Sequence, residues 1–226
     1  MSRKIRQEVK AILREGDLLA LQKFIASVPP KKVIKPLIQA FYNTDSLERW
    51  HAITAFGQAV AEIAQNEMED ARIIMRRLMW SLNDESGGIG WGAPEAMAEA
   101  MARNQTLSEE YSRILLSYIW EEGNYLEYLP LRRGALWGLM RLAQSHPEVF
   151  IEIEAARLVK NYLHDQDAES AALAALALGF AGKRKFCNQI KKMLSDKRQF
   201  KLYLNSELKE TSVSDAATLA IKALKC

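Results

Sequence analysis

The sequence is poor in the residues that build sheets. Its 226 residues include 7 Val and 5 Thr against 30 Ala and 28 Leu. Because β-branched residues favour strands, whereas Ala and Leu are the strongest helix formers, this imbalance excludes a strand-rich fold. Only 6 Pro and 11 Gly interrupt the chain. We predict an all-α protein, a single domain over residues 1–226, with no sheet of more than two strands.

Cysteine and long apolar runs are also scarce. Cys187 and Cys226 are too few for a disulfide framework, so we expect a reducing, cytoplasmic compartment and an unreactive, half-buried Cys187. The alternative is a reactive Cys187 activated by the neighbouring cations. The charged start, residues 1–6, predicts no signal peptide. The uncharged run 170–182 is shorter than the ~20 residues that cross a bilayer, so we expect no membrane partner.

Motifs for metal, nucleotide and nucleophilic chemistry are absent from the sequence. His51, His146 and His164 are far apart, and no His-x-x-x-His or Cys-x-x-Cys spacing indicates a metal site. There is no P-loop and no Gly-x-Ser-x-Gly elbow. Residues 88–93 match the letters of a dinucleotide fingerprint, but a predicted helix precedes them where the fingerprint needs a strand. We therefore expect no catalytic residues, no metal and no cofactor.

Helical periodicity and short connections run along most of the chain. We predict helices at about residues 3–15, 17–27, 31–43, 46–64, 67–82, 94–104, 107–121, 131–145, 148–164, 167–181, 184–195 and 212–225. Thr106 and Glu109 have the spacing of a capping box at the start of one helix. Asp165 or Asp167 can cap another.

Small residues recur in these helices at an interval of two helices and two turns. The pattern is anchored on Ala52, Ala93, Ala135, Ala172 and Ala217, with spacings of 41, 42, 37 and 45 residues. A buried small residue in each repeat lets neighbouring helices approach closely, so that repeats can stack.

The sharpest copy of the repeat carries a resemblance to a known family. Residues 165–182 run Asp-Gln-Asp-Ala-Glu-Ser-Ala-Ala-Leu-Ala-Ala-Leu-Ala-Leu-Gly-Phe-Ala-Gly, an acidic turn followed by an Ala-rich helix ending in Leu-Gly. This resembles HEAT and armadillo-like solenoids, in particular the short repeats of the phycobilisome-lyase type. The resemblance implies a right-handed α-α superhelix of about five helical pairs. Glu169 and Ser170 stand where such repeats carry an Arg, a departure that weakens any inference of lyase activity.

Charge is distributed unevenly along the chain. Residues 1–40 have a net charge of +6, residues 41–182 of −10, and residues 183–226 of +7. Polar outer faces on terminal repeats account for the basic ends, and an anionic partner bound at one end is the alternative. Because the acidic middle offers no continuous basic track, we do not expect specific nucleic-acid binding.

The segment 80–95 is unusual for a connection between repeat helices. Four of the eleven Gly lie within residues 87–92, and a Trp stands on either side of most of them. Aromatic rings with a few convergent polar groups hold small ligands or peptides, and carboxylates between two Trp suit a Lys- or Arg-bearing peptide. The alternative is a structural loop whose Trp residues cover a gap between repeats. We predict that this segment forms part of a binding site. Its predicted binding residues are Trp80, Asn83, Asp84, Glu85, Gly87, Gly88, Trp91 and Glu95.

A second group of residues is predicted to line a groove beside this segment. Arg133 and Trp137 lie four residues apart, on one face of a helix. If the second helix of each pair lines the concave side, Arg49 and Trp50 share that groove with them. The alternative for both Trp residues is packing between repeats.

These observations favour a non-catalytic HEAT-like repeat module, a scaffold that recognises a protein or peptide partner through its concave groove and segment 80–95. A HEAT-like DNA glycosylase is an alternative, which the net charge of −10 in the middle of the chain disfavours. A cofactor lyase or chaperone is another, which rests on the resemblance to phycobilisome-lyase repeats alone.

Overall fold

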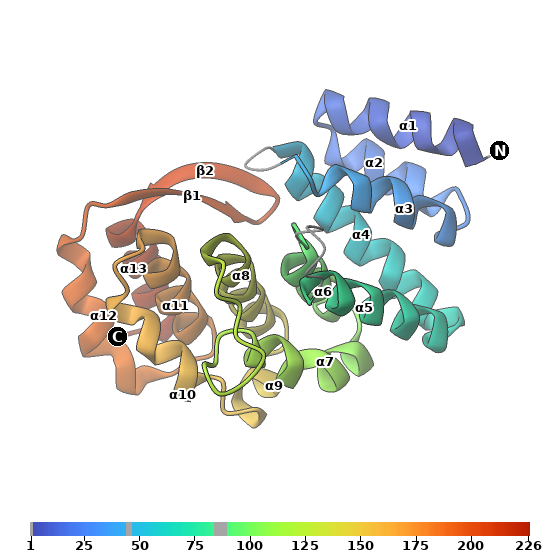
Figure 1. Ribbon diagram of the computed structural model, residues 1–226. Helices are drawn as coiled ribbons and strands as arrows, with labels where there is room; N and C mark the ends of the chain where they lie inside the picture. Colours follow the sequence, from blue (N-terminus) through green and yellow to red (C-terminus); the bar gives the residue numbers. More distant parts are fainter. Residues whose placement is uncertain (1, 44–46, 84–89) are drawn as a thin grey trace. The chain divides into compact units, whose positions relative to one another are not determined.

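A computed structural model describes residues 2–43, 47–83 and 90–226 (Figure 1). Within these ranges the regular structure is helical apart from one two-stranded hairpin. The predictions of an all-α fold, and of no sheet larger than two strands, are confirmed for the described residues.

The chain divides into two compact units. Unit 1 comprises Met1–Leu107 with Asn205–Glu207, and unit 2 comprises Ser108–Leu204 with Leu208–Cys226. A single domain over the whole chain stays a prediction. The first seven helices are α1 (Ser2–Glu15), α2 (Leu18–Ala26), α3 (Lys31–Ala40), α4 (Leu47–Asn66), α5 (Met68–Leu82), α6 (Ala93–Met101) and α7 (Gln105–Ser117).

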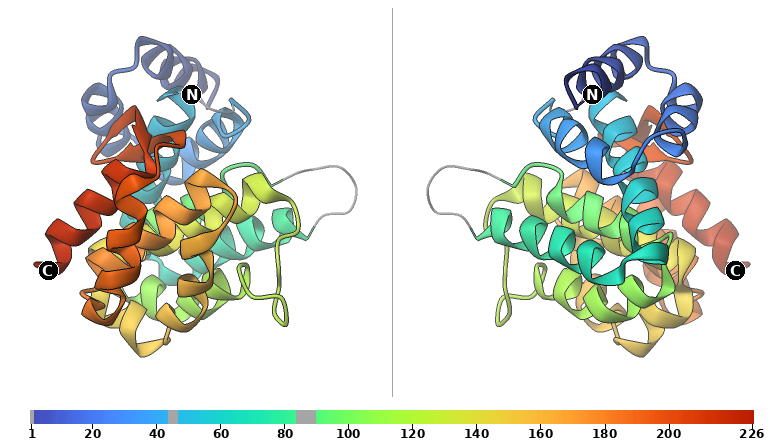
Figure 2. Two further views of the ribbon diagram at one scale, coloured as in Figure 1. Left: turned by 90° about the vertical axis from the view of Figure 1, so that its left-hand side faces the viewer. Right: turned by 90° about the vertical axis from the view of Figure 1, so that its right-hand side faces the viewer.

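The later elements begin with the irregular segment 118–128, which follows α7 (Figure 2). After it come α8 (Leu129–Ser145), α9 (Pro147–Glu152), α10 (Ala156–Val159), the 3₁₀ helix η1 (Lys160–His164), α11 (Ala168–Phe180), η2 (Arg184–Phe186), α12 (Cys187–Lys192), η3 (Met193–Ser195), strands β1 (Gln199–Leu204) and β2 (Glu207–Ser212), and α13 (Val213–Leu224).

Helix α4 is the centre of unit 1. It packs against α3, α5 and α6, and the rings of Phe41 and Phe56 meet edge to face at 5.5 Å. Gly57 brings its backbone against α6, because a Cβ at this position would lie 2.7 Å from the backbone carbon of Glu99. Only a residue without a side chain allows the two helices to lie this close.

Helix α11 is the centre of unit 2, as α4 is of unit 1. It packs against α8, α13 and η1, and its residues 170–179 are all buried. A Cβ on Gly179 would lie 2.7 Å from the Cα of Ala220 on α13. Both units therefore contain a glycine at which two helix backbones nearly touch.

The five repeat anchors lie in the interior. Ala52, Ala93, Ala135, Ala172 and Ala217 are each at most 1% exposed. The predicted burial of one small residue in each repeat is confirmed. The handedness of the superhelix and the number of helical pairs stay predictions.

Two capping predictions can be compared with the structure. The capping box of Thr106 and Glu109 is wrong: α7 begins at Gln105, and the Leu107 N–H donates to Asn104 Oδ1 at 3.0 Å. The helix starts earlier than expected because the amide of Asn104 satisfies a first-turn N–H. Asp167 is the N-cap of α11, accepting from the Ser170 N–H at 2.9 Å, as one of the two predicted alternatives.

Two other regions differ from the predicted helices. The expected helix 148–164 is interrupted between α9 and α10, where Glu154 has a φ of 55°. The hairpin β1–β2 was not predicted at all. Its turn residues Asn205 and Ser206 both have positive φ, as two-residue hairpin turns of type I′ require. Asn tolerates this conformation and Ser carries no such signal, so the sequence marks the turn weakly.

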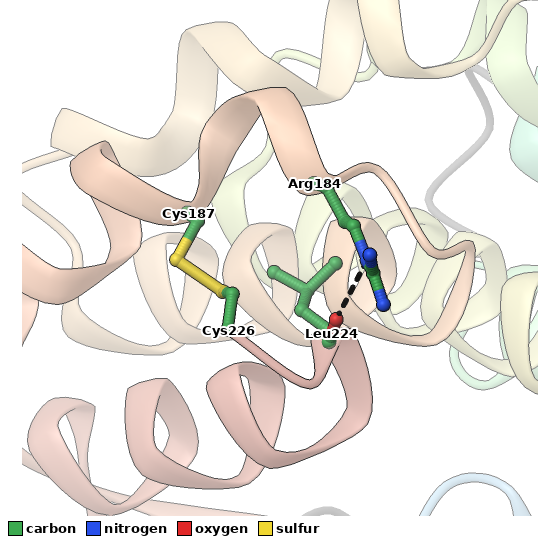
Figure 3. The surroundings of a disulfide bond; sticks show 4 residues. All are labelled: Arg184, Cys187, Leu224 and Cys226. Carbon is green, nitrogen blue, oxygen red and sulfur yellow. Dashed lines mark hydrogen bonds between the residues drawn. A yellow bond between two sulfur atoms is a disulfide. The ribbon is translucent and has the colours of Figure 1, made fainter.

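The two cysteines form a disulfide between the start of α12 and the end of the described chain (Figure 3). Beside it, Arg184 Nε donates to the carbonyl oxygen of Leu224 at 3.1 Å. The prediction of an unreactive, half-buried Cys187 did not include this pairing: the residue is buried and bonded to Cys226. A separation of 39 residues gives no sequence signal for pairing. The reducing, cytoplasmic compartment stays a prediction.

In the described parts of the chain, none of the helices combines the length and the apolar character needed to cross a membrane.

The disulfide predicts a redox-dependent stability. Closing a ring of this length lowers the entropy of the unfolded chain and stabilises the fold by about 3–4 kcal/mol. Urea unfolding followed by circular dichroism is expected to shift to lower urea when a phosphine reductant is added. The Cys187→Ser/Cys226→Ser variant is expected to unfold at the same urea concentration as the reduced protein, with or without the reductant. Identical unfolding of the wild-type protein with and without reductant would contradict the pairing.

Candidate functional site

Arg49 and Glu95, both predicted as binding residues, form a buried ion pair between α4 and α6. The pair joins Arg49 Nη2 to Glu95 Oε1, and the two side chains are 10% and 4% exposed. The Arg49 guanidinium also lies 4.8 Å from the ring centroid of Trp50. Because desolvation of two charges offsets much of their attraction, such a pair fixes how two helices meet more than it adds net stability.

Further polar groups are buried around the same two helices. Glu99, one turn after Glu95, pairs with Arg103 at 3.2 Å. His51 is buried on α4, and burial lowers the pKa of its ring below the ordinary value, so the imidazole is neutral at pH 7. The polar residues of this region are thus largely enclosed within unit 1.

The residues at the end of α5 are placed differently. Trp80, in the last turn, is 68% exposed, and Asn83 is the exposed C-cap residue. The predicted site residues Asp84, Glu85, Gly87 and Gly88 lie outside the described residues. The structure therefore presents a large aromatic side chain to solvent at the start of the predicted binding segment.

The described end of the segment, residues 90–92, is packed against its surroundings. A Cβ on Gly90 would lie 2.7 Å from the carbonyl oxygen of Ser81. Gly92 has a φ of +74°, and a Cβ there would lie 3.1 Å from Phe41. Trp91, between them, is half-buried. These two glycines are needed for close backbone approach and turn geometry, so part of the glycine content of the segment is structural.

Arg133 and Trp137 lie on α8 in unit 2, and both have partners there. Arg133 donates through Nε to Asp167 at 3.0 Å and lies 3.5 Å from Glu169. Trp137 is buried, and its indole N–H donates to the carbonyl oxygen of Tyr203 on β1 at 2.8 Å. Asp167 was predicted only as a helix cap, and its pairing with Arg133 was not predicted.

Asp167 joins two functions in one carboxylate. Burial by itself raises its pKa, but hydrogen bonds from Arg133 and Ser170 outweigh burial and hold the pKa below the ordinary value. The ionised carboxylate therefore caps α11 and ties it to α8 at neutral pH.

The structure brings only some of the predicted site residues together. It joins Arg49 to Glu95 within unit 1, and it places Arg133 beside Trp137 on α8 within unit 2. Trp80 has the exposure that a recognition residue needs, whereas Glu95 and Trp137 are enclosed. Among the described residues there is no group of three or more His, Cys, Asp or Glu that could hold a metal ion.

The buried pair leads to a prediction about stability. Glu95→Ala leaves the Arg49 charge buried without its partner and is expected to lower the free energy of unfolding by about 3 kcal/mol, measured by urea titration. The double variant Arg49→Met/Glu95→Leu is expected to recover most of that loss. Glu154→Gln, which breaks an exposed pair with Arg157, serves as the control and is expected to leave the midpoint unchanged. Additive losses in the double variant would contradict the coupling.

Comparison with known proteins places the fold. No protein family model matches the sequence. An uncharacterized protein of Archaeoglobus fulgidus is 29% identical over 187 residues, covering 80% of this chain and 93% of that protein. A designed armadillo repeat protein solved in complex with the peptide (KR)4 has a TM-score of 0.56 at 16% identity, over 98% of both chains.

A second designed armadillo repeat protein has a TM-score of 0.52 at 17% identity, covering 99% of this chain and all of that one. At such identities the likeness shows the fold and nothing finer. The chain has the all-α fold of armadillo/HEAT-like helical repeat proteins.

Proposed function

We propose that the chain is a helical repeat scaffold that binds a protein or peptide partner carrying Lys or Arg side chains, and that segment 80–95 forms part of the binding site. The fold supports this proposal, because a designed protein of the same fold was solved with the alternating Lys-Arg peptide (KR)4. That observation concerns the designed protein. For this chain, it identifies a probe with which to test the proposal.

The single observation that carries the proposal is the exposure of Trp80. A Trp side chain that is 68% exposed leaves a large apolar area in water. Trp is enriched among the residues that dominate binding energy at protein interfaces, where its ring is desolvated by the partner. Its ring face also attracts the cations of Lys and Arg.

The neighbouring residues supply the rest of the proposed site. Asn83 adds an exposed amide, and Asp84 and Glu85 add two carboxylates by sequence. In this proposal, Gly87 and Gly88 let the backbone approach the partner. Trp91 is the second aromatic group.

The enclosed residues have a different part in the proposal. Arg49 and Glu95 fix α6, whose first residues are the last of segment 80–95. Arg133 and Trp137 belong to the proposed concave groove, where Arg133 is the more exposed of the two. The glycosylase and lyase alternatives stay predictions of the sequence, without a specific observation in their favour.

The experiment is a fluorescence-anisotropy titration of the full chain with labelled (KR)4 and, for comparison, a neutral (GS)4 peptide. We expect tighter binding of (KR)4 at physiological salt. Trp80→Ala is expected to weaken that binding about tenfold, the loss of about 1.4 kcal/mol typical of a truncated interface Trp. Asp84→Asn/Glu85→Gln is expected to weaken it by a similar factor. Melting temperatures are measured in parallel, and Trp80→Ala is expected to melt with the wild type.

Two matched variants serve as controls. Tyr42→Ala removes another exposed aromatic side chain from unit 1, and Glu8→Gln/Glu15→Gln changes the net charge by the same amount on the exposed part of α1. Both are expected to bind as the wild type does. Equal binding of (KR)4 and (GS)4, or equal losses in the site and control variants, would contradict the proposed function.

A further inference from the structure

The segment between α7 and α8, residues 118–128, is an ordered loop in unit 2 that none of the predicted functions uses; we name it the 118–128 loop (Figure 1). Eleven residues are far more than a turn between two helices needs. Long loops with a defined conformation in compact domains are commonly functional.

Hydrogen bonds from inside the unit hold the loop in place. Its two ends meet where the Leu126 N–H donates to the carbonyl oxygen of Tyr118 at 3.0 Å. The buried Tyr162 hydroxyl donates to the carbonyl oxygen of Ile119 at 2.9 Å. At the tip, the Gly123 N–H donates to the carbonyl oxygen of Trp120 at 2.9 Å. The backbone of the loop is therefore held by hydrogen bonds within the loop and by one from the buried Tyr162.

Arg132, on α8, completes this framework. Its Nη1 donates to the carbonyl oxygens of Leu126 and Glu127 at 2.8 and 3.0 Å, and its guanidinium lies 5.0 Å from the ring centroid of Tyr125. The nearest cation in the sequence is thus used to hold the loop backbone and one aromatic ring. A preformed loop of this kind loses little conformational entropy when a partner binds.

The outer surface of the loop combines aromatic rings with carboxylates. Trp120 is 43% exposed and Tyr128 is 49% exposed. Glu121, Glu122 and Glu127 are exposed too, and none of the three carboxylates has an ion-pair partner among the described residues. No Lys or Arg occurs from residue 114 to residue 131. Arg132 donates to backbone carbonyl oxygens of the loop, so the three carboxylates are left without an ion pair in the described parts of the chain and can bind a cationic partner.

We propose that the 118–128 loop is a docking surface for a segment of another protein that bears Lys or Arg side chains. Carboxylates bind such side chains through charge-assisted hydrogen bonds, and the faces of Trp and Tyr rings attract the same cations. The charge complementarity selects this partner: phosphate groups of nucleic acids or anionic lipids are repelled by the three carboxylates of the loop. The proposal concerns unit 2 and does not depend on segment 80–95.

Trp120 provides a direct readout, because the five Trp residues occupy different environments. Trp50 and Trp137 are buried, Trp91 is half-buried, and Trp80 and Trp120 are exposed. The full chain is labelled with 5-fluorotryptophan, each ¹⁹F resonance is assigned by a Trp→Phe substitution, and the labelled protein is titrated with (KR)4. The acidic peptide (ED)4 is the comparison.

We expect the Trp120 resonance to shift saturably with (KR)4 and to stay in place with (ED)4, while the Trp137 resonance does not move. Glu121→Gln/Glu122→Gln is expected to raise the midpoint of the Trp120 shift about fivefold, as the loss of two exposed ion pairs would. Glu148→Gln/Glu152→Gln makes the same change in net charge on the exposed face of α9, and is expected to change that midpoint less than about twofold.

A Trp120 resonance that does not respond to (KR)4 at concentrations up to about 1 mM overturns the proposal, and so do equal effects of the two double variants. The Trp80 resonance reports separately on segment 80–95. A shift at Trp80 without a shift at Trp120 therefore rejects docking at the 118–128 loop and retains the proposed function. The opposite pattern rejects segment 80–95 and retains the loop.

Discussion

Close approach of helix backbones at glycine is the constraint on which the packing of both units depends. In unit 1, α4 and α6 meet where Gly57 faces the backbone of Glu99, and in unit 2, α11 and α13 meet where Gly179 faces Ala220. Neither contact leaves room for a methyl group. Dispersion contacts increase as backbones approach, and a repeat protein depends on such contacts between neighbouring helices for its stability. The buried alanines of each repeat extend the same close packing along the helices.

This dense packing decides what the charged residues can do. Arg49 and Glu95 connect α4 to α6, and Arg133 and Asp167 connect α8 to α11. Each pair lies at a junction between helices, where it specifies how they meet and leaves little charge free for a partner. The exposed Trp residues lie elsewhere, Trp80 in the last turn of α5 and Trp120 in the 118–128 loop, and the two proposals place recognition there.

The helical architecture was predictable because its signals are local. The burial of the five anchor alanines and a cap at Asp165 or Asp167 follow from composition and spacing. In the structure the five alanines are buried, and Asp167 is the N-cap of α11. The features that were missed either join residues far apart in sequence or carry a weak local signal. The pairing of Cys187 with Cys226 has no local signal, and the turn at Asn205 is marked by one favourable residue only.

The candidate site was predictable only in part, for the same physical reason. Residue types and spacing identified Trp80 and Glu95 equally, yet one side chain is exposed and the other is enclosed beside Arg49. Which face of a helix is covered depends on the helix that packs on it, and that partner is not encoded nearby. The conformation of the 118–128 loop was not predictable because one of its anchors, the Tyr162 hydroxyl on Ile119, comes from a residue far away in sequence.

The most direct test of the central constraint is the free energy of unfolding of Gly57→Ala and Gly179→Ala, measured by urea titration. Alanine has the higher helix propensity by about 1 kcal/mol, so propensity alone predicts that both variants are more stable than the wild type. Close backbone approach predicts the opposite. Overpacking costs about 1–3 kcal/mol, and both variants are expected to unfold at lower urea than the wild type. Variants as stable as the wild type, or more stable, would contradict the account.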